Sequence, residues 1–385
     1  MTAKRLRLGM VGGGEGAFIG AVHRMAARLD DRWTLVAGAF QSDPERSVAF
    51  GRTLGLENER CYASFDEMAE REAARADRID AVSIVTPNHL HAPAASAFLR
   101  TGIPVICDKP LGVSTAEVRA LERLVSDTGL PFIVTHNYSG YPMIREARAM
   151  IASGELGDIR LVQVEYAQDW LATDLSGNKQ ADWRGDPARA GPGGALGDIA
   201  THAFHLAEFT TGTAVSSLAA DLSTFVPNRR VDDNANILLR FENGAKGSLW
   251  ASQVAVGAAN ALRLRVYGEK AGLEWMQETP DALLLTPLSE PPRLMRRGGP
   301  SLSAAALHAS RIPAGHPEGY LEGFAQIYSD AAELVRAHNE RRPPDPLAAV
   351  CPNIRDGVRG VTFIEATIAS NRNNGAWTPI DGEPV

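Results

Sequence analysis

The sequence predicts an α/β protein: a doubly wound parallel sheet, followed by an α+β domain with a large, mostly antiparallel open sheet. Two observations predict the first part. A glycine-rich turn stands between a strand and a helix near the start of the chain, and strands then alternate with helices for about 135 residues. One observation predicts the second part: from residue 138, strand-like runs follow one another with short turns. We therefore expect two domains, residues 1–137 and 138–385.

The glycine-rich turn follows an apolar run, residues 8–11, which is long enough for a short buried strand. After the turn, helical spacing links Ile19, Val22, Ala26 and Leu29. Gly12 would allow the tight turn, and Gly14 would let the backbone approach a pyrophosphate at the helix N-terminus. The third glycine of a G-x-G-x-x-G motif is matched by Ala17, or by Gly20 with a longer loop, and we prefer Gly20. A flexible loop without a ligand is the alternative.

The remaining elements of the first domain follow in order. Strands are predicted at residues 33–40, 81–85, 104–107 and 131–135, and helices begin after Asp43-Pro44, Ser64, Asn88 and Ser114. Parallel sheets bind ligands beyond the carboxyl ends of their strands. Five side chains or turns lie at such ends: Gly12, Gln41, Thr86, Lys109 and Asn137. This coincidence predicts a single site.

The second domain is predicted to contain more strands than helices. Strand-like runs lie at residues 159–170, 218–225, 235–241, 245–256, 262–268 and 283–286, and helices at 144–153, 193–211, 319–337 and 353–370. The alternation in residues 262–267 predicts a sheet face that is solvated or meets a partner. Residues 287–318, rich in Pro, Arg and Gly, are interpreted as a long loop. Its basic cluster, Arg293, Arg296 and Arg297, is expected to be solvated.

Composition excludes several classes of protein. The net charge of −7 argues against binding to nucleic acid or to an anionic membrane. Three scattered cysteines, Cys61, Cys107 and Cys351, favour neither a disulfide framework nor a zinc site. We expect neither export nor a membrane span, because no apolar leader precedes the first strand and no run of about eighteen apolar residues occurs. A cytoplasmic protein fits these features.

Three residues are candidates for chemistry. Lys109 lies at a strand end between Asp108 and Pro110, where an ordinary surface lysine is the alternative. Asp198 and His202 are four residues apart, so a helix would place them on one face, where a carboxylate can orient an imidazole that acts as a general base. A helix with a satisfied polar face is the alternative. With His205 a metal site is conceivable, but a third ligand of suitable geometry is not evident, and we expect no metal.

Four ordered motifs resemble those of the Gfo/Idh/MocA oxidoreductase family: the glycine turn, residues 86–91 (T-P-N-H-L-H), Asp108-Lys109-Pro110, and Gly193-Gly194 followed by Asp198-x-x-x-His202. The resemblance covers nearly the whole chain. It implies a Rossmann domain that binds a nicotinamide cofactor, and an open sheet used for substrate binding and for dimer or tetramer contacts. It further implies that Lys109 polarises the reacting hydroxyl, that His202 takes its proton, and that Asp198 binds substrate and holds His202.

The sequence departs from the family pattern in three places. Asp108 replaces a commoner Glu, the first glycine loop is longer, and Gln41-Ser42 stands where many members carry an acidic residue. A carboxylate there would repel a 2′-phosphate. We therefore expect a modest preference for NAD, with NADP not excluded and with Arg46 as a possible phosphate partner. The predicted cofactor-binding residues are Gly12, Gly14, Gly16, Ala17, Phe18, Ile19, Gln41, Ser42, Arg46, Thr86, Pro87, Asn88, His91, Asp108, Lys109 and Asn137.

The substrate is expected to be a sugar or cyclitol. Residues 168–170 (Q-D-W) and 316–320 (H-P-E-G-Y) resemble the inositol, L-glucose and levoglucosan dehydrogenases of the family. Tryptophan faces suit a ring, and amides, carboxylates and arginine suit its hydroxyls, although the tryptophans could instead serve the core. The candidates include Asn178 and Lys179, and the predicted substrate-binding set is Lys109, Gln168, Trp170, Trp183, Arg184, Asp198, His202 and His316. An NAD-dependent glycosidase and a non-catalytic dinucleotide-binding sensor are the rival hypotheses.

Overall fold

A computed structural model describes residues 4–175 and 177–380, and of Lys179 it describes only the backbone. The chain forms two compact units, Met1–Asn137 with Phe324–Val358, and Tyr138–Gly323 with Arg359–Val385. Two of the boundaries fall within α11 (Tyr320–Glu340) and α12 (Ile354–Arg372). The division by sequence placed residues 324–358 in the second domain. They belong to the first unit because Tyr328 bonds its core: the indole of Trp33 donates to the carbonyl oxygen of Tyr328 at 2.8 Å.

The first unit contains the predicted doubly wound sheet. Its strands are β1 (Leu6–Gly12), β2 (Trp33–Ala39), β3 (Ala81–Val85), β4 (Val105–Cys107) and β5 (Phe132–Val134). They are all parallel in the order β2-β1-β3-β4-β5, so the strand order reverses between β1 and β3. Open α/β sheets bind ligands beyond the carboxyl ends of the strands at such a reversal. The fold thus places the glycine turn, which follows β1, at the expected crevice.

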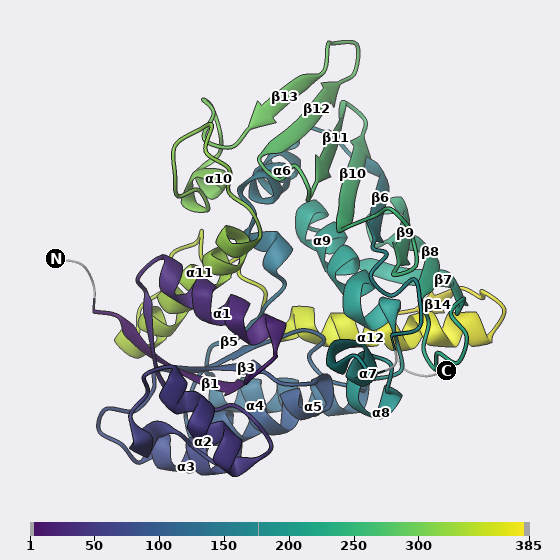
Figure 1. The fold of residues 1–385 in the computed structure, drawn as a ribbon. Helices are drawn as coiled ribbons and strands as arrows, with labels where there is room; N and C mark the ends of the chain where they lie inside the picture. Colours follow the sequence, from purple (N-terminus) through teal and green to yellow (C-terminus); the bar gives the residue numbers. More distant parts are fainter. Residues whose placement is uncertain (1–3, 176, 381–385) are drawn as a thin grey trace. The chain divides into compact units, whose positions relative to one another are not determined.

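Helices flank this sheet as the sequence predicts (Figure 1). They are α1 (Phe18–Leu29), α2 (Pro44–Thr53), α3 (Phe65–Ala73), α4 (His91–Arg100) and α5 (Thr115–Thr128). The predicted caps are confirmed, because Asp43, Ser64 and Ser114 each accept a backbone N–H from the first turn of the following helix. The capping residues therefore fix where α2, α3 and α5 begin.

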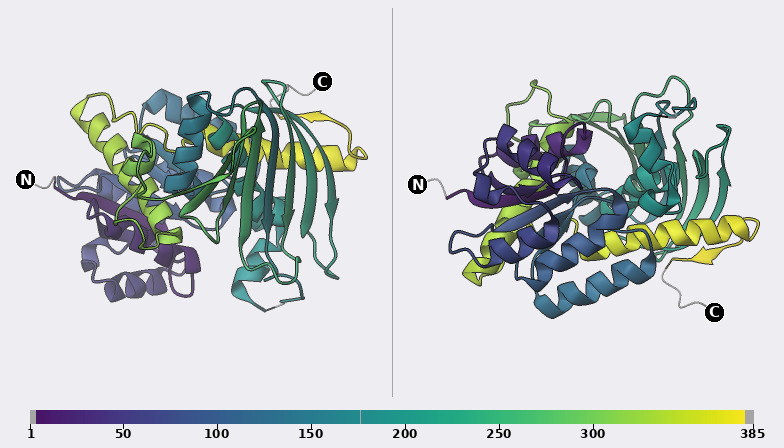
Figure 2. Two further views of the ribbon diagram at one scale, coloured as in Figure 1. Left: turned by 90° about the horizontal axis from the view of Figure 1, so that it is seen from above. Right: turned by 60° about the horizontal axis from the view of Figure 1, so that its bottom comes forward.

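The second unit is built on a nine-stranded sheet, whose strands run lengthwise beside one another in the left view of Figure 2. Its order is β13-β12-β11-β10-β6-β9-β8-β7-β14, and every neighbouring pair is antiparallel except β6 with β9. The strands are β6 (Ile159–Ala167), β7 (Val215–Ser223), β8 (Asn234–Phe241), β9 (Lys246–Ser252), β10 (Ala261–Gly268), β11 (Ala271–Met276), β12 (Ala282–Pro287), β13 (Arg293–Arg296) and β14 (Thr378–Pro379). The predicted fold class is confirmed.

The two faces of this sheet differ in character. Helix α9 (Thr201–Thr211) packs on the face that buries Val164, Leu264 and Trp275. The remaining helices are α6 (Pro142–Ala152), α7 (Lys179–Arg184), α8 (Pro187–Ala190) and α10 (Ala304–His308). The other face carries ion pairs, including Arg263 with Glu274 at 2.8 Å and Arg263 with Glu165 at 3.7 Å. The alternation predicted for residues 262–267 is therefore confirmed.

The structure of this unit differs from the sequence expectations in several places. Strand β11 was not predicted, and residues 287–318 are not one long loop, since they include β13 and α10. Arg297 is not solvated: its guanidinium is buried and pairs with Asp281 at 2.8 Å and with Glu318 at 2.9 Å. The buried carboxylate of Glu318 and the half-buried carboxylate of Asp281 supply the charge that lets an arginine leave water, and neither is near Arg297 in sequence.

The helix predicted at residues 193–211 also differs in detail. Residues Leu196–Ala200 form a π-helical turn, and the α-helix proper begins at Thr201. π turns inside helices occur mostly as single turns and are frequent at functional sites. The turn contains Asp198 and immediately precedes the segment with His202.

Candidate active site

The glycine turn lies against the ends of β2 and β3. Gly12 has φ of +83°, and a Cβ added there would be 2.9 Å from the backbone nitrogen of Thr86. A Cβ added at Gly14 would be 2.5 Å from Cγ of Gln41. The turn can therefore approach its neighbours only because it lacks side chains, and the predicted residues Gly12, Gln41 and Thr86 do meet.

Helix α1 begins beside this turn without a side-chain cap. Its N-cap is Ala17, whose own N–H donates to the carbonyl oxygen of Gly14 at 3.1 Å, and no side chain accepts from the first turn. Uncapped N–H groups at a helix start suit a phosphate group. Gly20 packs against Gly13, since a Cβ there would be 2.3 Å from Cα of Gly13. That is the helix–strand contact expected of the third glycine, although α1 already begins at Phe18.

The other predicted cofactor residues near the turn differ in exposure. Phe18 is 65% exposed, whereas Ile19 packs against the buried cluster of Met10, Phe40 and Val85. Gly16 has a positive φ of +75°. Ser42 is exposed. Arg46 is exposed too and pairs with Glu15 at 3.2 Å, so its guanidinium is shared with a carboxylate near the turn.

Buried polar atoms line the carboxyl ends of β3 and β5. The Oγ1 atom of Thr86 and the Nδ2 atom of Asn137 are buried and have no hydrogen-bond partner within the described structure. Such groups ordinarily find a partner. Pro87 and Asn88 continue the chain from Thr86, and Asn88 is buried. A nicotinamide cofactor fits these observations, because the glycines leave room for it and its polar groups can satisfy the buried atoms.

Lys109 is positioned by the residue that precedes it. The Oδ1 atom of Asp108 accepts the Lys109 N–H at 2.8 Å and the Thr135 hydroxyl at 2.9 Å. The Lys109–Pro110 peptide is cis. Nδ1 of His91 lies 2.7 Å from the carbonyl oxygen of Pro110, and Nε2 of His91 lies 2.8 Å from the carbonyl oxygen of Thr86. Lys109 is thus part of a turn fixed at several points.

A buried histidine lies beneath this turn. His23, in α1, has no exposed surface, and its Nε2 is 3.9 Å from Oδ2 of Asp108. Its Nδ1 is 2.8 Å from the hydroxyl of Tyr328, which is 2.7 Å from the hydroxyl of Ser83. Burial lowers the pKa of His23 to about 4, although the Asp108 carboxylate opposes this. His23 is therefore neutral at physiological pH.

In the second unit, Asp232 holds the start of the helix that carries Asp198 and His202. Its two carboxylate oxygens accept the N–H groups of Gly194 and Leu196, each at 2.7 Å. A Cβ added at Gly194 would be 2.0 Å from the Asp232 carbonyl oxygen, so this position requires glycine. Burial raises the pKa of Asp232 to about 6, and the two N–H groups oppose the rise.

Asp198 is held by two side chains from other elements. Its Oδ2 accepts from Nε2 of Gln253 at 2.8 Å and lies 3.4 Å from Nε of Arg184. The guanidinium of Arg184 is stacked 4.4 Å from the ring centre of Trp183 and 5.8 Å from that of Trp170. Four predicted substrate residues, Arg184, Trp170, Trp183 and Asp198, are therefore together.

A chain of hydrogen bonds passes beside the ring of His202. Tyr138 lies edge-on to that ring, with 5.0 Å between centres, and its hydroxyl is 2.6 Å from that of Tyr166. The Tyr166 hydroxyl and the Gln168 amide both donate to Oδ1 of Asn260, at 2.8 and 2.7 Å. Burial raises the pKa of both tyrosines, so they remain hydrogen-bond donors at neutral pH. Tyr138, Tyr166, Gln253 and Asn260 were missed by sequence reasoning.

His316 has contacts of another kind. Its carbonyl oxygen accepts from Arg297, and its exposed ring lies 3.4 Å from the carbonyl oxygen of Pro313. In contrast to Arg184, it makes no hydrogen bond, ion pair or ring contact with the other predicted substrate residues within the described structure.

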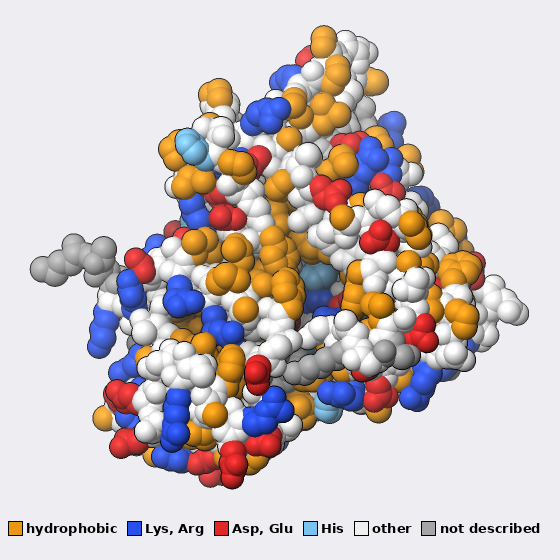
Figure 3. Space-filling view, in the orientation of Figure 1, with side chains coloured by type: hydrophobic (Ala, Val, Ile, Leu, Met, Phe, Trp, Pro, Cys, Tyr) orange, Lys and Arg blue, Asp and Glu red, His pale blue; other side chains and the backbone are white. Residues whose placement is uncertain are grey.

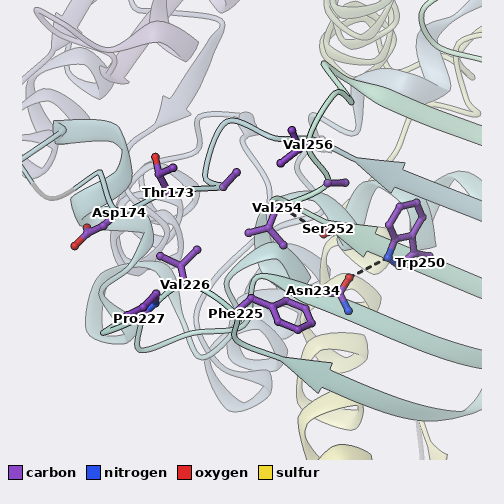
Figure 4. A pocket seen from close by; sticks show the side chains of 12 residues that line it. Thr173, Asp174, Phe225, Val226, Pro227, Asn234, Trp250, Ser252, Val254 and Val256 are labelled. Atoms are coloured by element: carbon purple, nitrogen blue, oxygen red, sulfur yellow. Dashed lines mark hydrogen bonds between the residues drawn. The ribbon is translucent and has the colours of Figure 1, made fainter.

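A separate open pocket of about 520 Å³ lies in the second unit (Figure 4). Its floor includes Trp250, whose indole donates to Asn234 at 3.0 Å, and its rim includes the exposed side chains of Phe225 and Val256. None of the sequence-predicted site residues is among the described residues that line it. The pocket is thus distinct from the cluster around Asp198.

Surface charge, possible metal ligands and helix hydrophobicity bear on what the protein could bind. Lys and Arg side chains are interspersed with Asp and Glu over the face shown in Figure 3. Within residues 4–175 and 177–380, no group of three or more His, Cys, Asp or Glu could hold a metal ion, so Asp198, His202 and His205 form no such group. None of the described helices has the length and apolar character needed to span a bilayer.

Comparison with known proteins places both halves of the chain. Residues 6–136 match an oxidoreductase family with an NAD-binding Rossmann fold, and residues 144–274 match the GFO/IDH/MocA C-terminal domain. The chain belongs to the Gfo/Idh/MocA oxidoreductase family. The expected family and the expected nicotinamide cofactor are confirmed, and the first unit of this family member binds NAD.

Three relatives show how far the similarity extends. An oxidoreductase from Sinorhizobium meliloti is 51% identical, with 97% of this chain and 99% of that chain covered and a TM-score of 0.89. An inositol dehydrogenase homolog from Azotobacter vinelandii, solved with NADH and myo-inositol, is 36% identical over 98% of both chains, with a TM-score of 0.90. Levoglucosan dehydrogenase of Pseudarthrobacter phenanthrenivorans is 28% identical over 98% of both chains.

Proposed function

We propose that this family member is a dehydrogenase that oxidises a ring hydroxyl of a cyclic polyol or sugar, such as an inositol, a glucose isomer or an anhydrosugar. The observation that carries the proposal is the cluster around Asp198. Two tryptophan rings, the Arg184 guanidinium and the Asp198 carboxylate stand together, and tryptophan faces with charged hydrogen-bonding groups suit a polyhydroxylated ring. The relatives solved or named with myo-inositol and levoglucosan support the same class.

Each residue has a proposed role in the reaction. His202 accepts the proton of the reacting hydroxyl, and Lys109 donates a hydrogen bond to its oxygen. Asp198 accepts a hydrogen bond from a substrate hydroxyl, with its orientation fixed by Gln253. NAD held by the first unit would supply the hydride acceptor for the carbon that carries the reacting hydroxyl, so the product would be a ketone or lactone. Gln168, Trp170, Trp183, Arg184 and His316 are proposed to contact the rest of the ring.

The test is a substrate panel of inositols, hexoses and anhydrosugars, each with NAD⁺ and with NADP⁺, followed by absorbance of the reduced cofactor. We expect oxidation of a ring polyol, with NAD⁺ preferred, and no oxidation of cyclohexanol, because a site built for hydroxyls rejects analogues that lack them. Rapid oxidation of simple alcohols with no activity on any ring polyol would overturn the proposal. Turnover of a glycoside without net reduction of NAD⁺ would identify a glycosidase instead.

Two variants separate chemistry from binding. Lys109→Met should lower kcat about a hundredfold or more while NADH still binds, since it removes a hydrogen bond made to the reacting oxygen. Trp170→Ala should raise KM more than it lowers kcat, because the ring face contributes to binding. A Lys109→Met enzyme with near-normal turnover would remove this lysine from the mechanism.

We also propose that the protein is a cytoplasmic dimer or tetramer. The nine-stranded sheet has one charged face, and the side chains Leu161, Leu238 and Tyr267 on that face are exposed and apolar or aromatic. All three cysteines are buried and free, which suits a reducing compartment. Light scattering of the purified protein tests the oligomer, and a monomer at micromolar concentration would refute it.

A further inference from the structure

His91 lies at the first residue of α4, directly after the segment that begins at Thr86. Its side chain is buried, with 1% of its surface exposed. Nδ1 is 2.7 Å from the carbonyl oxygen of Pro110, and Nε2 is 2.8 Å from the carbonyl oxygen of Thr86. The ring therefore spans two backbone segments that are 24 residues apart in sequence.

Both ring nitrogens are used in these contacts, so neither faces a ligand. The sequence expectation that His91 binds the cofactor becomes, in this geometry, an indirect role. The two carbonyl groups belong to the segments that contact the glycine turn and that carry Lys109. Thr86 lies against Gly12 of the glycine turn, and Pro110 follows Lys109 through the cis peptide.

The contact with Pro110 and the contact with Thr86 can be removed one at a time, because each uses a different ring nitrogen. A carbonyl oxygen only accepts, so the imidazole must donate, and the neutral ring donates from one nitrogen whereas the protonated ring donates from both. Burial lowers the pKa of His91, while the Asp108 carboxylate and the two carbonyl groups raise it. Each ring nitrogen lies within hydrogen-bond distance of a different carbonyl oxygen, so a side chain with one amide can reproduce one contact at a time.

We propose that His91 is a positioning residue, a brace that ties the Lys109–Pro110 turn to the end of β3 and so fixes Lys109 relative to the glycine turn. The importance of Lys109 rests on the proposed function. The brace itself is a property of the first unit and can be tested without any substrate. Pro110 is held on one side of the ring and Thr86 on the other, so losing one contact affects one segment first.

The experiment uses paired variants of the full chain. In His91→Asn, the amide nitrogen replaces Nδ1 and can still donate to Pro110. In His91→Gln, the longer side chain places its amide nitrogen near Nε2 and can still donate to Thr86. His91→Phe removes both ring nitrogens. His338→Gln, at an exposed position of α11, is the matched control.

Two readouts follow the two segments. NADH binding by fluorescence reports on the turn beside Thr86. The ¹³C NMR spectrum of reductively ¹³C-methylated lysines reports on Lys109, whose signal is assigned with Lys109→Met. The chain has five lysines, Lys4, Lys109, Lys179, Lys246 and Lys270, so the spectrum is simple. Neither readout requires turnover, and failure of the polyol panel would therefore leave this test intact.

We expect a crossed pattern. His91→Gln should shift the Lys109 signal and leave the NADH Kd within about twofold. His91→Asn should weaken NADH binding about tenfold, the effect of one net hydrogen bond, and leave the Lys109 signal in place. His91→Phe should show both effects. A purely structural role would lower Tm in all three variants without this pattern, and that result, or wild-type values in both readouts, would overturn the proposal.

A measurement on the wild-type protein tests the proposal even if the variants fail to fold. At least one ring N–H of His91 should exchange with solvent far more slowly than that of the exposed His338, as seen in ¹⁵N-labelled histidine spectra. Exchange of the His91 ring at the same rate as His338 would refute the brace, whatever the variants do.

Discussion

The buried ring of His23 makes the stability of the first unit depend on pH. The perturbation is His23→Asn, which keeps an oxygen acceptor for the hydroxyl of Tyr328 but removes the titrating group. The wild-type ring has no exposed surface, lies beneath Asp108 and is bonded to Tyr328. Protonating it would place a charge in this interior, which is the cost that burial imposes.

The size of this pH-dependent change in the free energy of unfolding follows from the pKa of His23. Burial lowers the pKa of His23 from 6.5 to about 4, so the folded protein binds this proton less tightly than the unfolded chain. The stability contributed by the neutral ring is fully present above pH 6.5 and is lost as pH falls through 4. The whole difference corresponds to about 3.4 kcal/mol, of which about 2 kcal/mol is lost between pH 7.5 and pH 5.

The assay is urea unfolding followed by ¹⁹F NMR of fluorotryptophan-labelled protein. Trp33 is the one tryptophan in the sequence of the first unit, and its indole is bonded to Tyr328, so its signal reports on this unit alone. Wild type should lose about 2 kcal/mol more than His23→Asn between pH 7.5 and pH 5. An exposed control, His338→Gln, should behave as wild type. Equal losses in wild type and His23→Asn would show that His23 does not stay neutral in the fold.

Three further predictions concern single changes. Asp108→Glu adds one methylene and should bring a carboxylate within hydrogen-bond reach of His23, raising the pKa of that ring above 4; histidine NMR titration checks this, and an unchanged pKa contradicts it. Gly194→Ala should lower Tm by several degrees, whereas Gly319→Ala, where a Cβ meets nothing within 4 Å, should not; calorimetry compares the two, and equal Tm values would discount the predicted clash. Gln41→Asp should increase the kcat/KM preference for NAD⁺ over NADP⁺ about tenfold, and a constant ratio would place the ribose elsewhere.

Local signals in the sequence predicted the first unit closely. The caps at Asp43, Ser64 and Ser114 and the alternation of strands and helices depend on neighbouring residues, and both are visible in the chain. The grouping of Gly12 and Thr86 could also be predicted, because parallel strands end at a common edge. Tyr328, by contrast, joins the core of this unit from nearly two hundred residues beyond its first segment. No local pattern near Tyr328 indicates that contact.

The parts that could not be predicted depend on partners distant in sequence. Asn260 belongs to none of the sequence motifs, yet it accepts from both Tyr166 and Gln168. Arg297 resembles a solvated residue until Asp281 and Glu318 are placed against it. Residue type did place Arg184 and Trp170 among the substrate candidates, but their stacking and the ion pair with Asp198 required the fold.

The π turn at Leu196–Ala200 has a consequence for insertions and deletions. A π turn holds one residue more than an α turn, so deleting one residue from it would convert the turn into ordinary α-helix. The start of the segment, anchored by Asp232, and the helix that carries His202 would then both keep their directions. An inserted residue has no such register to restore, and it would rotate one side of the turn against the other by about 100°.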